Sequence, residues 1–395
     1  MGPLAGVRVL DFTVFQQGPQ ASVIFADMGA DVIKVEPPRF GDLGRVVGSK
    51  GEERFSPYFL AHNRGKRSIT LDIKKEEAKR ICLELAARCD VAIHNFRPGV
   101  MERLGLGYDD MRKVNERIIY GHASGYGAKG PRANHPAFDL AAQAQGGIIS
   151  VTGEPEGFPV PAGAAIADYV GAVNLALAVI SALFARERTG CGQKIDTSLL
   201  GGQIAMQAWE IQFFIAHGWV GRAGRGHHYL PTIWRVFQTT DSYVVVGGLP
   251  ENRWPKFCEA LGLPEIEHDP RFEDYMTRLA NLQELYGILD KTFLTKTSAE
   301  WMDLLQAADC ICATVASYHD LVRDPQLRAN EYIVEVDHPT QGRIPVVGAP
   351  WRFSETPAEI APAAPELGQH TEEVLQDLGY SWEQINALRE QGVFG

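Results

Sequence analysis

The first 125 residues alternate short apolar runs with helix-like segments, and this alternation limits the fold more than any other feature. The β-branched run DVIKVE at 31–36 follows a helix-like stretch that ends near Met28. Similar apolar runs lie at 7–12, 68–73, 91–96 and 118–124. Strands that alternate with helices are typical of a parallel sheet with helices on both faces. We therefore predict an α/β fold whose large domain contains a Rossmann-like parallel sheet.

Polar or glycine-rich segments follow these predicted strands, as Gln16 and Gln17 follow the first. In an open parallel sheet such loops meet at the carboxyl edge, where these folds bind their ligands. No Gly-x-Gly-x-x-Gly follows the first strand, so the usual dinucleotide signal is absent. We expect a ligand site at this edge of the sheet, and no NAD.

The second half of the chain predicts a smaller α+β domain. A long apolar helix is expected at 168–187, and GQKIDTSLL at 192–200 leads into another helix. VFQTTDSYVVVGG then predicts a hairpin, helical segments follow, and a terminal helix begins near Thr371. We place the large domain at 1–205 and 335–395, a linker at 206–224, and the small domain at 225–334.

Composition and cysteine spacing argue against several classes of protein. The chain has 395 residues and a formal net charge of −11, whereas binding nucleic acid requires a basic surface. The pair Cys310 and Cys312 has no second pair to complete a zinc site, so we expect free thiols and no metal. The N-terminus lacks a signal-peptide pattern, and the apolar run at 169–185 is short for a membrane span. We expect a cytoplasmic protein without nucleic-acid or membrane partners.

Asp168 is the candidate catalytic residue. It lies where a loop of small residues, including Ala165 and Ala167, becomes the long apolar helix. An aspartate in this position is commonly a helix cap, which accepts backbone N–H groups and suits the positive end of the helix dipole. The same position would hold a carboxylate ionised and aimed, and a desolvated carboxylate can act as a nucleophile. On position alone both roles stay open.

Basic side chains gather in two segments of this acidic chain. Arg97 and Arg103 lie just beyond a predicted strand, together with Asn95 and Phe96, and Asn95 can bond either a backbone or an adenine edge. Arginine suits phosphate because its guanidinium forms two parallel hydrogen bonds. A second basic cluster lies at 62–72. Each cluster alone is compatible with solvated charges, but together they indicate an anionic ligand.

Other candidate sites in the sequence are weaker. A lone histidine at a sheet edge, such as His122 or His135, is usually structural, and the pair His227-His228 has no carboxylate or cysteine to complete a metal site. The glycines of GRAGRG at 221–226 lack the lysine and strand context of a phosphate-binding loop. We interpret that segment as a flexible lid.

Several segments, in order, resemble the family III CoA-transferases, also called the CaiB/BaiF family. They are VRVLDFTVFQQGPQASVIFADMGADVIKVEPP, NRGKRSITLD, NFRPGVMERLGLGYDDM, GAAIADYVGAVNLALAVISALFARERTGCGQKIDTSLL, HPTQGRIPVVGAPWRFSETP and LGQHTEEVL. The resemblance covers nearly the whole chain and is weakest between about 205 and 335. This family includes formyl-CoA and carnitine CoA-transferases as well as α-methylacyl-CoA racemases. The resemblance implies an interlocked homodimer of two ring-like chains.

The resemblance also implies roles for single residues. Asp168 takes the place of a catalytic aspartate that forms a mixed anhydride with the donor acyl group and then an aspartyl-CoA thioester. The implied CoA-binding residues are Gln16, Gln17, Arg39, Leu71, Asp72, Ile73, Lys74, Asn95, Phe96, Arg97, Arg103, His135 and Phe138. The implied substrate residues are Gly224, Gly226, His228 and Glu251.

Two departures from the family pattern bear on these roles. Formyl-CoA transferase-like sequences carry an arginine where this chain has Pro37, and Arg39 is the candidate replacement. Racemases pair the aspartate with a histidine in a Gly-His-Asp motif, where this chain has Phe138 before Asp139. Because phenylalanine cannot accept a proton, we favour CoA transfer. A 2-methylacyl-CoA racemase is the alternative, since Glu251 falls near a racemase glutamate.

The substrates stay open at this point. The implied partners are an acyl-CoA, with succinyl-CoA as one candidate donor, and a carboxylic acid acceptor. Formate and oxalate, carnitine and butyrobetaine, and dicarboxylates such as succinate, malate or mesaconate all fit the resemblance. A protein that binds CoA without catalysis is a third hypothesis, which the intact aspartate disfavours.

Overall fold

The chain divides into two compact units. The computed structural model describes residues 1–49, 56–227, 233–338, 340–357 and 359–395. Unit 1 comprises residues 1–147, 163–208 and 325–395, and unit 2 comprises residues 148–162 and 209–324. Helix α10 (Ala208–His217) lies within the segment expected to act as a linker. The domain boundaries proposed from the sequence stay predictions.

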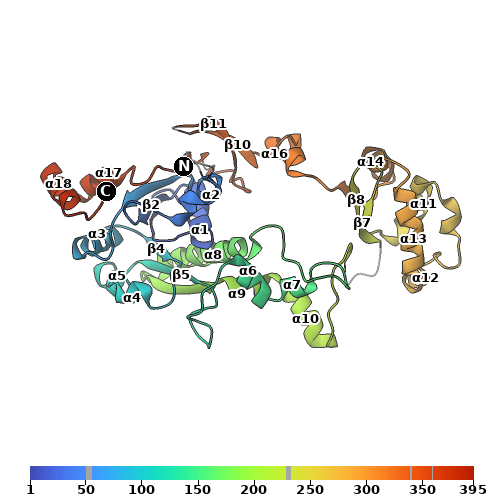
Figure 1. Ribbon diagram of the computed structural model, residues 1–395, viewed down its shortest axis with the longest axis horizontal. Coiled ribbons are helices and arrows are strands. Elements are labelled where there is room, and N and C mark those ends of the chain that lie inside the picture. Colours follow the sequence, from blue (N-terminus) through green and yellow to red (C-terminus); the bar gives the residue numbers. More distant parts are fainter. Residues whose placement is uncertain (50–55, 228–232, 339, 358) are drawn as a thin grey trace. The chain divides into compact units, whose positions relative to one another are not determined.

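A six-stranded parallel sheet forms the centre of unit 1 (Figure 1), in the order β3-β2-β1-β4-β5-β6. This is the Rossmann strand order, and it confirms the predicted α/β fold. The strands are β1 (Arg8–Asp11), β2 (Asp31–Glu36), β3 (Lys66–Thr70), β4 (Val91–His94), β5 (Ile119–Ser124) and β6 (Gln193–Ser198). The inner strands are nearly continuous apolar runs because helices cover both of their faces.

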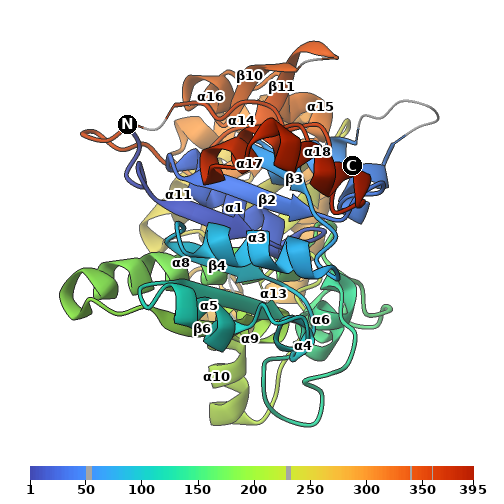
Figure 2. The same cartoon turned by 90° about the vertical axis from the view of Figure 1, so that its left-hand side faces the viewer.

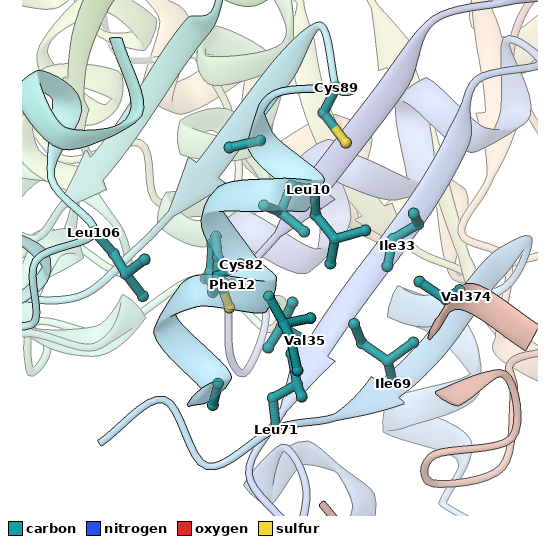
Figure 3. Close-up of a cluster of buried hydrophobic side chains, with 14 of the residues drawn as sticks. Leu10, Phe12, Ile33, Val35, Ile69, Leu71, Cys82, Cys89, Leu106 and Val374 are labelled. Atoms are coloured by element: carbon teal, nitrogen blue, oxygen red, sulfur yellow. The ribbon is translucent and has the colours of Figure 1, made fainter. Parts of the chain in front are cut away.

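Helices α1 (Gln17–Asp27) and α8 (Ile166–Thr189) pack on one face of this sheet, and α3 (Glu76–Ala86) packs on the other (Figure 2). The face under α3 also receives the last helices of the chain, so Val374 packs near Ile33 and Ile69 (Figure 3). The large unit is therefore built from both ends of the sequence. The other helical segments assigned to unit 1 are η1 (Leu43–Val46), α2 (Pro57–Asn63), α4 (Val100–Arg103), α5 (Tyr108–Val114), α6 (Asp139–Gln145), α9 (Leu199–Met206), α16 (Pro325–Ala329), α17 (Thr371–Leu378) and α18 (Trp382–Glu390).

Strand β6 was missed in the sequence, where the segment at 192–200 was expected only to lead into a helix. Residues Gln193–Ser198 pair in parallel with β5 as the edge strand, and α9 begins directly after them. Its sequence, QKIDTS, contains one apolar residue and is largely exposed. An edge strand of this kind lacks the apolar run by which buried strands are recognised.

Helix α8 is long and apolar enough by composition to cross a membrane, and it is the one such helix in the described part of the chain. Its buried residues, among them Leu175 and Val179, pack against the sheet with those of α1. A core helix of this kind passes the same length and hydropathy test as a membrane span. The packing explains why this run is so apolar.

Unit 2 contains an antiparallel sheet of three strands in the order β7-β8-β9. The hairpin expected from VFQTTDSYVVVGG forms as β7 (Trp234–Gln238) and β8 (Tyr243–Gly247), and β9 (Cys312–Thr314) pairs with β8. The helical segments are α7 (Ile148–Val151), η2 (Glu251–Arg253), α11 (Trp254–Leu261), η3 (Pro264–Glu267), α12 (Tyr275–Ala280), α13 (Leu282–Phe293), α14 (Ser298–Ala307) and α15 (Tyr318–Leu321). A second, two-stranded antiparallel sheet, β10 (Ile333–His338) with β11 (Gly342–Val347), belongs to unit 1.

The order of the central sheet places its topological switch point between β1 and β4. In folds of this type, the loops after the two strands on either side of the switch point leave the sheet in opposite directions and border a crevice that binds ligands. The side chain of Asn95, just after β4, bonds the backbone of Val14, just after β1. The two loops that border the crevice are therefore fixed to each other.

Candidate active site

Asp168 lies in the first turn of α8, as its third residue. The helix begins after Ala165, which makes no side-chain cap, so Asp168 is not the cap that its position suggested. The capping carboxylate is that of Asp139, whose Oδ1 accepts hydrogen bonds from the backbone N–H groups of Ala167 at 2.7 Å and Asp168 at 3.2 Å. The Asp168 carboxylate is left available for chemistry because another side chain satisfies the helix N-terminus.

The surroundings of Asp168 favour its protonated form. Burial, and secondly the negative charge of Asp139, raise the pKa of Asp168 from 3.8 to about 7. The expectation that the helix start alone would hold this carboxylate ionised is therefore wrong. A second carboxylate already occupies the helix N-terminus, and like charges in a partly buried site oppose each other. A carboxyl group perturbed in this way, at a sheet edge that binds ligands, is typical of a functional site.

Two further polar side chains, those of Tyr58 and Gln17, lie close to Asp168. The sequence did not predict this position for either of them. Burial, followed by the charges of Asp168, Asp42 and Asp139, raises the pKa of Tyr58 on α2 above its ordinary value. Gln17 begins α1, and a Cβ added to Gly171 of α8 would lie 2.8 Å from its Nε2. Gln17 therefore lies against α8 one turn beyond Asp168.

The amide of Gln17 is buried and has no hydrogen-bond partner for Nε2 within the part of the chain that the structure describes. An unpaired buried N–H group is costly, so its retention indicates a ligand or a water at this position. The sequence offered one signal for such a group, namely two glutamines directly after the first strand. It did not show that Gln17 faces the helix that carries Asp168.

Buried charges hold the carboxyl edge of the sheet in place. Nζ of Lys34 lies 3.0 Å from Oδ2 of Asp42 and donates to the carbonyl of Thr13 at 2.7 Å, and both charged side chains are fully buried. Oδ1 of Asp42 accepts from the backbone N–H of Phe15 at 3.0 Å. Phe15 has φ 62°, a left-handed conformation that is strained for a non-glycine residue and often marks a functional site.

Two of the predicted CoA-binding side chains are already occupied within the protein. Oδ1 of Asn95 accepts from the N–H of Val14 at 2.9 Å, and its Nδ2 donates to the carbonyl of Val14 at 2.8 Å. Of the two partners expected for Asn95, a backbone or an adenine edge, the structure shows the backbone. Leu71 is buried in the core under α3 and offers a ligand only its backbone. Phe96 is partly buried against the same core.

Four predicted basic residues remain exposed near the carboxyl ends of the strands: Arg39, Lys74, Arg97 and Arg103. None of them forms an ion pair with the residues that the structure describes. A Cβ added to Gly99 would lie 2.9 Å from Nη1 of Arg103, so this guanidinium folds over the turn that follows Arg97. Arg97 and Arg103 thus lie on one short segment after β4, and a guanidinium can bind phosphate through two parallel hydrogen bonds. Gln16, Asp72 and Ile73 lie in the corresponding loops after β1 and β3.

Phe138 and His135 lie on the segment before α6. Phe138 is 66% exposed, and its ring packs edge-on against that of Phe15 with centroids 5.4 Å apart. His135 is exposed and packs against Tyr126, with ring centroids 6.4 Å apart. The contact between Phe15 and Phe138 places the residue before Asp139 against the strained loop after β1.

The predicted substrate residues that the structure describes belong to unit 2, where backbone hydrogen bonds join the glycine-rich segment at 221–226 to residues 151–153. The backbone N–H of Gly224 donates to the carbonyl of Gly153 at 3.0 Å, and that of Gly226 to Ala223 at 2.9 Å. Glu251 forms an ion pair with Arg278. His228 lies outside the described residues.

Comparison with known proteins shows which family the chain resembles. CoA-transferase family III matches residues 4–371. The chain is 36% identical to the succinyl-CoA:glutarate CoA-transferase of Mus musculus, over 100% of this chain and 90% of the mouse protein. It is 34% identical to the formyl-CoA:oxalate CoA-transferase of Bradyrhizobium sp. (strain ORS 278), over 98% and 96% of the two chains.

Solved structures show the same relationship. A CaiB/BaiF family protein from Brucella suis superposes with a TM-score of 0.87 at 31% sequence identity, covering 95% of this chain and 99% of the other. The chain belongs to CoA-transferase family III, and it is an enzyme that transfers CoA. Its substrates are accordingly an acyl-CoA and a carboxylic acid.

Proposed function

We propose that the enzyme transfers CoA from an acyl-CoA to a short dicarboxylic acid through a covalent intermediate on Asp168. The observation that carries this proposal is the state of Asp168, a half-buried carboxyl group at the start of α8 whose capping role is filled by Asp139. A carboxylate relieved of structural hydrogen bonds and partly desolvated is a competent nucleophile.

The proposed reaction exchanges acyl groups without net proton transfer. A carboxylate oxygen of Asp168 attacks the donor thioester carbonyl, and the C–S bond breaks to release CoA thiolate and leave a mixed anhydride. The thiolate then attacks the aspartyl carbonyl, which releases the donor acid and gives an aspartyl-CoA thioester. The acceptor carboxylate attacks this thioester and repeats the two steps in reverse, which regenerates Asp168.

The loops at the switch point are the proposed CoA site. Arg97 and Arg103 would bind phosphate after β4, Arg39 and Lys74 would add charge from the loops after β2 and β3, and Gln17 would contact the reacting group beside α8. The exposed and unpaired state of the four cations supports this assignment, as does the unpaired amide of Gln17. Because Asn95 bonds Val14 with both amide atoms, we propose that it positions the loops rather than the adenine.

The acceptor class is proposed from the similar enzymes. The mouse relative is named for glutarate and the bacterial relative for oxalate, and both of these acids are dicarboxylates. We therefore rank dicarboxylates above carnitine and butyrobetaine, with succinyl-CoA and formyl-CoA as the first donors to assay. A panel of acyl-CoA donors and acids with mass detection of the new thioester tests this ranking. A carnitine thioester as the main product would contradict it.

A racemase activity is disfavoured by the groups around Asp168. Phe138 stands where a racemase carries a proton-accepting histidine, and both oxygens of Asp139 are engaged, Oδ1 by the start of α8 and Oδ2 by Gln143 at 2.6 Å. A second base is therefore missing at this position. We expect no deuterium incorporation at the α-carbon of a 2-methylacyl-CoA in D₂O.

The decisive experiment is trapping the intermediate. Incubation with acyl-CoA in the absence of acceptor, followed by hydroxylamine or borohydride, should modify Asp168 and no other carboxylate. Asp168→Asn and Asp168→Ala should abolish transfer while CoA binding persists. A fully active Asp168→Ala enzyme would overturn the covalent mechanism.

We also propose that the chain acts as a homodimer. Helix α8 exposes an apolar stripe at helical spacing, formed by Tyr169, Val173, Leu177 and Phe184, with Leu177 62% exposed. Exposed apolar side chains aligned on one helix face typically mark an interaction surface. A second copy of the chain is the occupant that the family resemblance implies.

A further inference from the structure

Three ionisable side chains form a row across the central sheet, away from Asp168. The registers pair His94 of β4 with His122 of β5, and His122 with Asp196 of β6. Side chains opposite each other on adjacent strands project from the same face of a sheet. The row therefore lies near the carboxyl ends of three neighbouring strands, beside the loop that carries Phe96 and Arg97.

Both ring nitrogens of His122 contact hydrogen-bond acceptors. Nδ1 lies 2.9 Å from Oδ1 of Asp196, and Nε2 lies 2.9 Å from the backbone carbonyl oxygen of Phe96. A carboxylate and a carbonyl can only accept, and a neutral imidazole has one N–H. Only the doubly protonated ring donates to both partners, and the His122 ring is buried with little access to water.

His94 shows the opposite behaviour. Its ring stacks on that of His122 with centroids 4.5 Å apart and an interplanar angle of 14°. Neither of its nitrogens has a hydrogen-bond partner in the described chain, and the side chain is 2% exposed. Burial, followed by the neighbouring His122 and then Lys194, holds the pKa of His94 well below its ordinary value. His94 is thus a neutral aromatic ring stacked on that of His122.

We propose that His122 is a positioning residue for acyl-CoA, which as an imidazolium paired with Asp196 fixes the peptide between Phe96 and Arg97. Its Nε2–H holds the Phe96 carbonyl, and Arg97 is the next residue along the chain. The inference rests on the proposed placement of CoA phosphate at Arg97 and Arg103. Loss of the second proton would turn a lone pair toward an acceptor, release this peptide and weaken acyl-CoA binding without touching Asp168.

Charged groups of both signs lie around His122. Asp196 is the direct partner, and it is shared with Lys194 of the same strand at 3.6 Å. Glu102 of α4 lies 3.9 Å from Lys194 and partly offsets its charge. Among the described residues, the ring of His94 stacks on that of His122, and the phenol of Tyr120 packs against His94. A buried imidazolium requires such a paired carboxylate, because burying an isolated charge is strongly unfavourable.

The protonation state is tested directly by nitrogen-15 NMR of ring-labelled histidine in the full-length enzyme, with the His122 signals assigned by their loss in His122→Gln. We expect both ring nitrogens to show imidazolium shifts at neutral pH, and Asp196→Asn to weaken that state. A neutral tautomer at neutral pH in the wild-type enzyme would overturn the inference, whatever the kinetics show.

The functional link is tested by kinetics with a matched pair of variants. His122→Phe should raise the KM for the acyl-CoA donor about tenfold, the effect of losing a hydrogen bond from a charged group, and leave kcat within about twofold. His94→Phe, the control from the adjacent strand, removes no hydrogen bond and should leave both constants unchanged. His122→Gln, which keeps one donor, serves if His122→Phe fails to fold and should raise KM to a smaller extent.

Arg97→Ala separates this inference from the proposed CoA site. A raised KM in Arg97→Ala together with an unchanged KM in His122→Phe would overturn the role of His122 alone. An unchanged KM in Arg97→Ala would overturn the proposed phosphate site, and with it the link between His122 and CoA. A raised KM in both variants, with kcat preserved in His122→Phe, supports the inference.

Discussion

At the scale of single residues, the neighbouring carboxylates of Asp139 and Asp168 have different roles. Asp139 satisfies the N-terminus of α8, and Asp168, in the first turn of the helix, is left half-buried with a raised pKa. As the proposed nucleophile, Asp168 must be ionised to attack, so the same arrangement limits the pH range of the proposed reaction. Part of the raised pKa is the consequence of placing two carboxylates together, and it should be visible in the pH dependence of the enzyme.

The pH dependence of transfer is the first prediction. Since the pKa of Asp168 is raised to about 7, kcat/KM should fall as the pH drops below 7. Asp139→Asn removes the neighbouring charge and should move this acid limb to lower pH, but only in part, because burial is the larger cause. Steady-state rates from pH 5 to pH 9 measure the limb. A limb near pH 4 in the wild-type enzyme would contradict the assignment.

The second prediction concerns stability. A carboxyl group with a raised folded-state pKa stabilises the fold below its unfolded pKa of 3.8, and this contribution is lost as the pH rises to about 7. Asp168→Asn cannot ionise, so its free energy of unfolding relative to the wild type should increase by about 2 kcal/mol between pH 5 and pH 8. Urea denaturation at the two pH values measures the difference. Asp303→Asn, at an exposed position of α14, is the control and should show no such change.

At the scale of elements, the site depends on loops that are fixed to one another by buried polar contacts. The loop after β1 is held by Asn95 from the loop after β4 and by Asp42 from the segment after β2. Asp42 in turn pairs with Lys34, in a fully buried ion pair. Three strand ends are thereby joined to one another, which supports the proposed orientation of a thioester against the start of α8.

The third prediction concerns the buried ion pair between Lys34 and Asp42. Asp42→Ala leaves the Lys34 ammonium buried without its partner and should lower the free energy of unfolding by about 3 kcal/mol. The double variant Lys34→Met/Asp42→Ala removes both charges and should be more stable than Asp42→Ala alone. Chemical denaturation of the three proteins compares them. A double variant less stable than the single one would show that the pairing is not what stabilises this edge.

At the scale of the whole molecule, unit 1 is assembled from both ends of the chain, while unit 2 is formed largely by the residues between them. The apolar stripe on α8 remains exposed in the single chain. Exposed apolar area of this kind favours association, because burial removes it from water.

The fourth prediction is the oligomeric state. The enzyme should sediment with twice the mass of one chain, and Leu177→Glu should shift the equilibrium toward the monomer by burying a charge in the contact. Val114→Glu alters another exposed apolar side chain, on α5 and outside this stripe, and should leave the mass unchanged. Sedimentation equilibrium distinguishes the two outcomes. A dimeric Leu177→Glu protein would exclude this stripe from the interface.

The sequence by itself determined the parallel sheet, its order of strands and helices along the chain, and the family. These features are local, since a buried strand or an amphipathic helix shows its period in five to fifteen consecutive residues. Strand β6 was not predicted because the sequence of an exposed edge strand shows no such period. Asp168 was identified through resemblance, since its position alone was more typical of a helix cap.

Tertiary structure alone decided what the polar residues do. Asn95 bonds Val14, 81 positions away, and Asp139 caps a helix that begins 27 positions later, so no local pattern records either contact. The raised pKa of Asp168 and the alignment of His94, His122 and Asp196 also depend on segments that lie far apart in the sequence. Hydrogen bonds and desolvation depend on distances between segments that only the folded sheet brings together. These distances determine the environment of Asp168, which the sequence alone does not show.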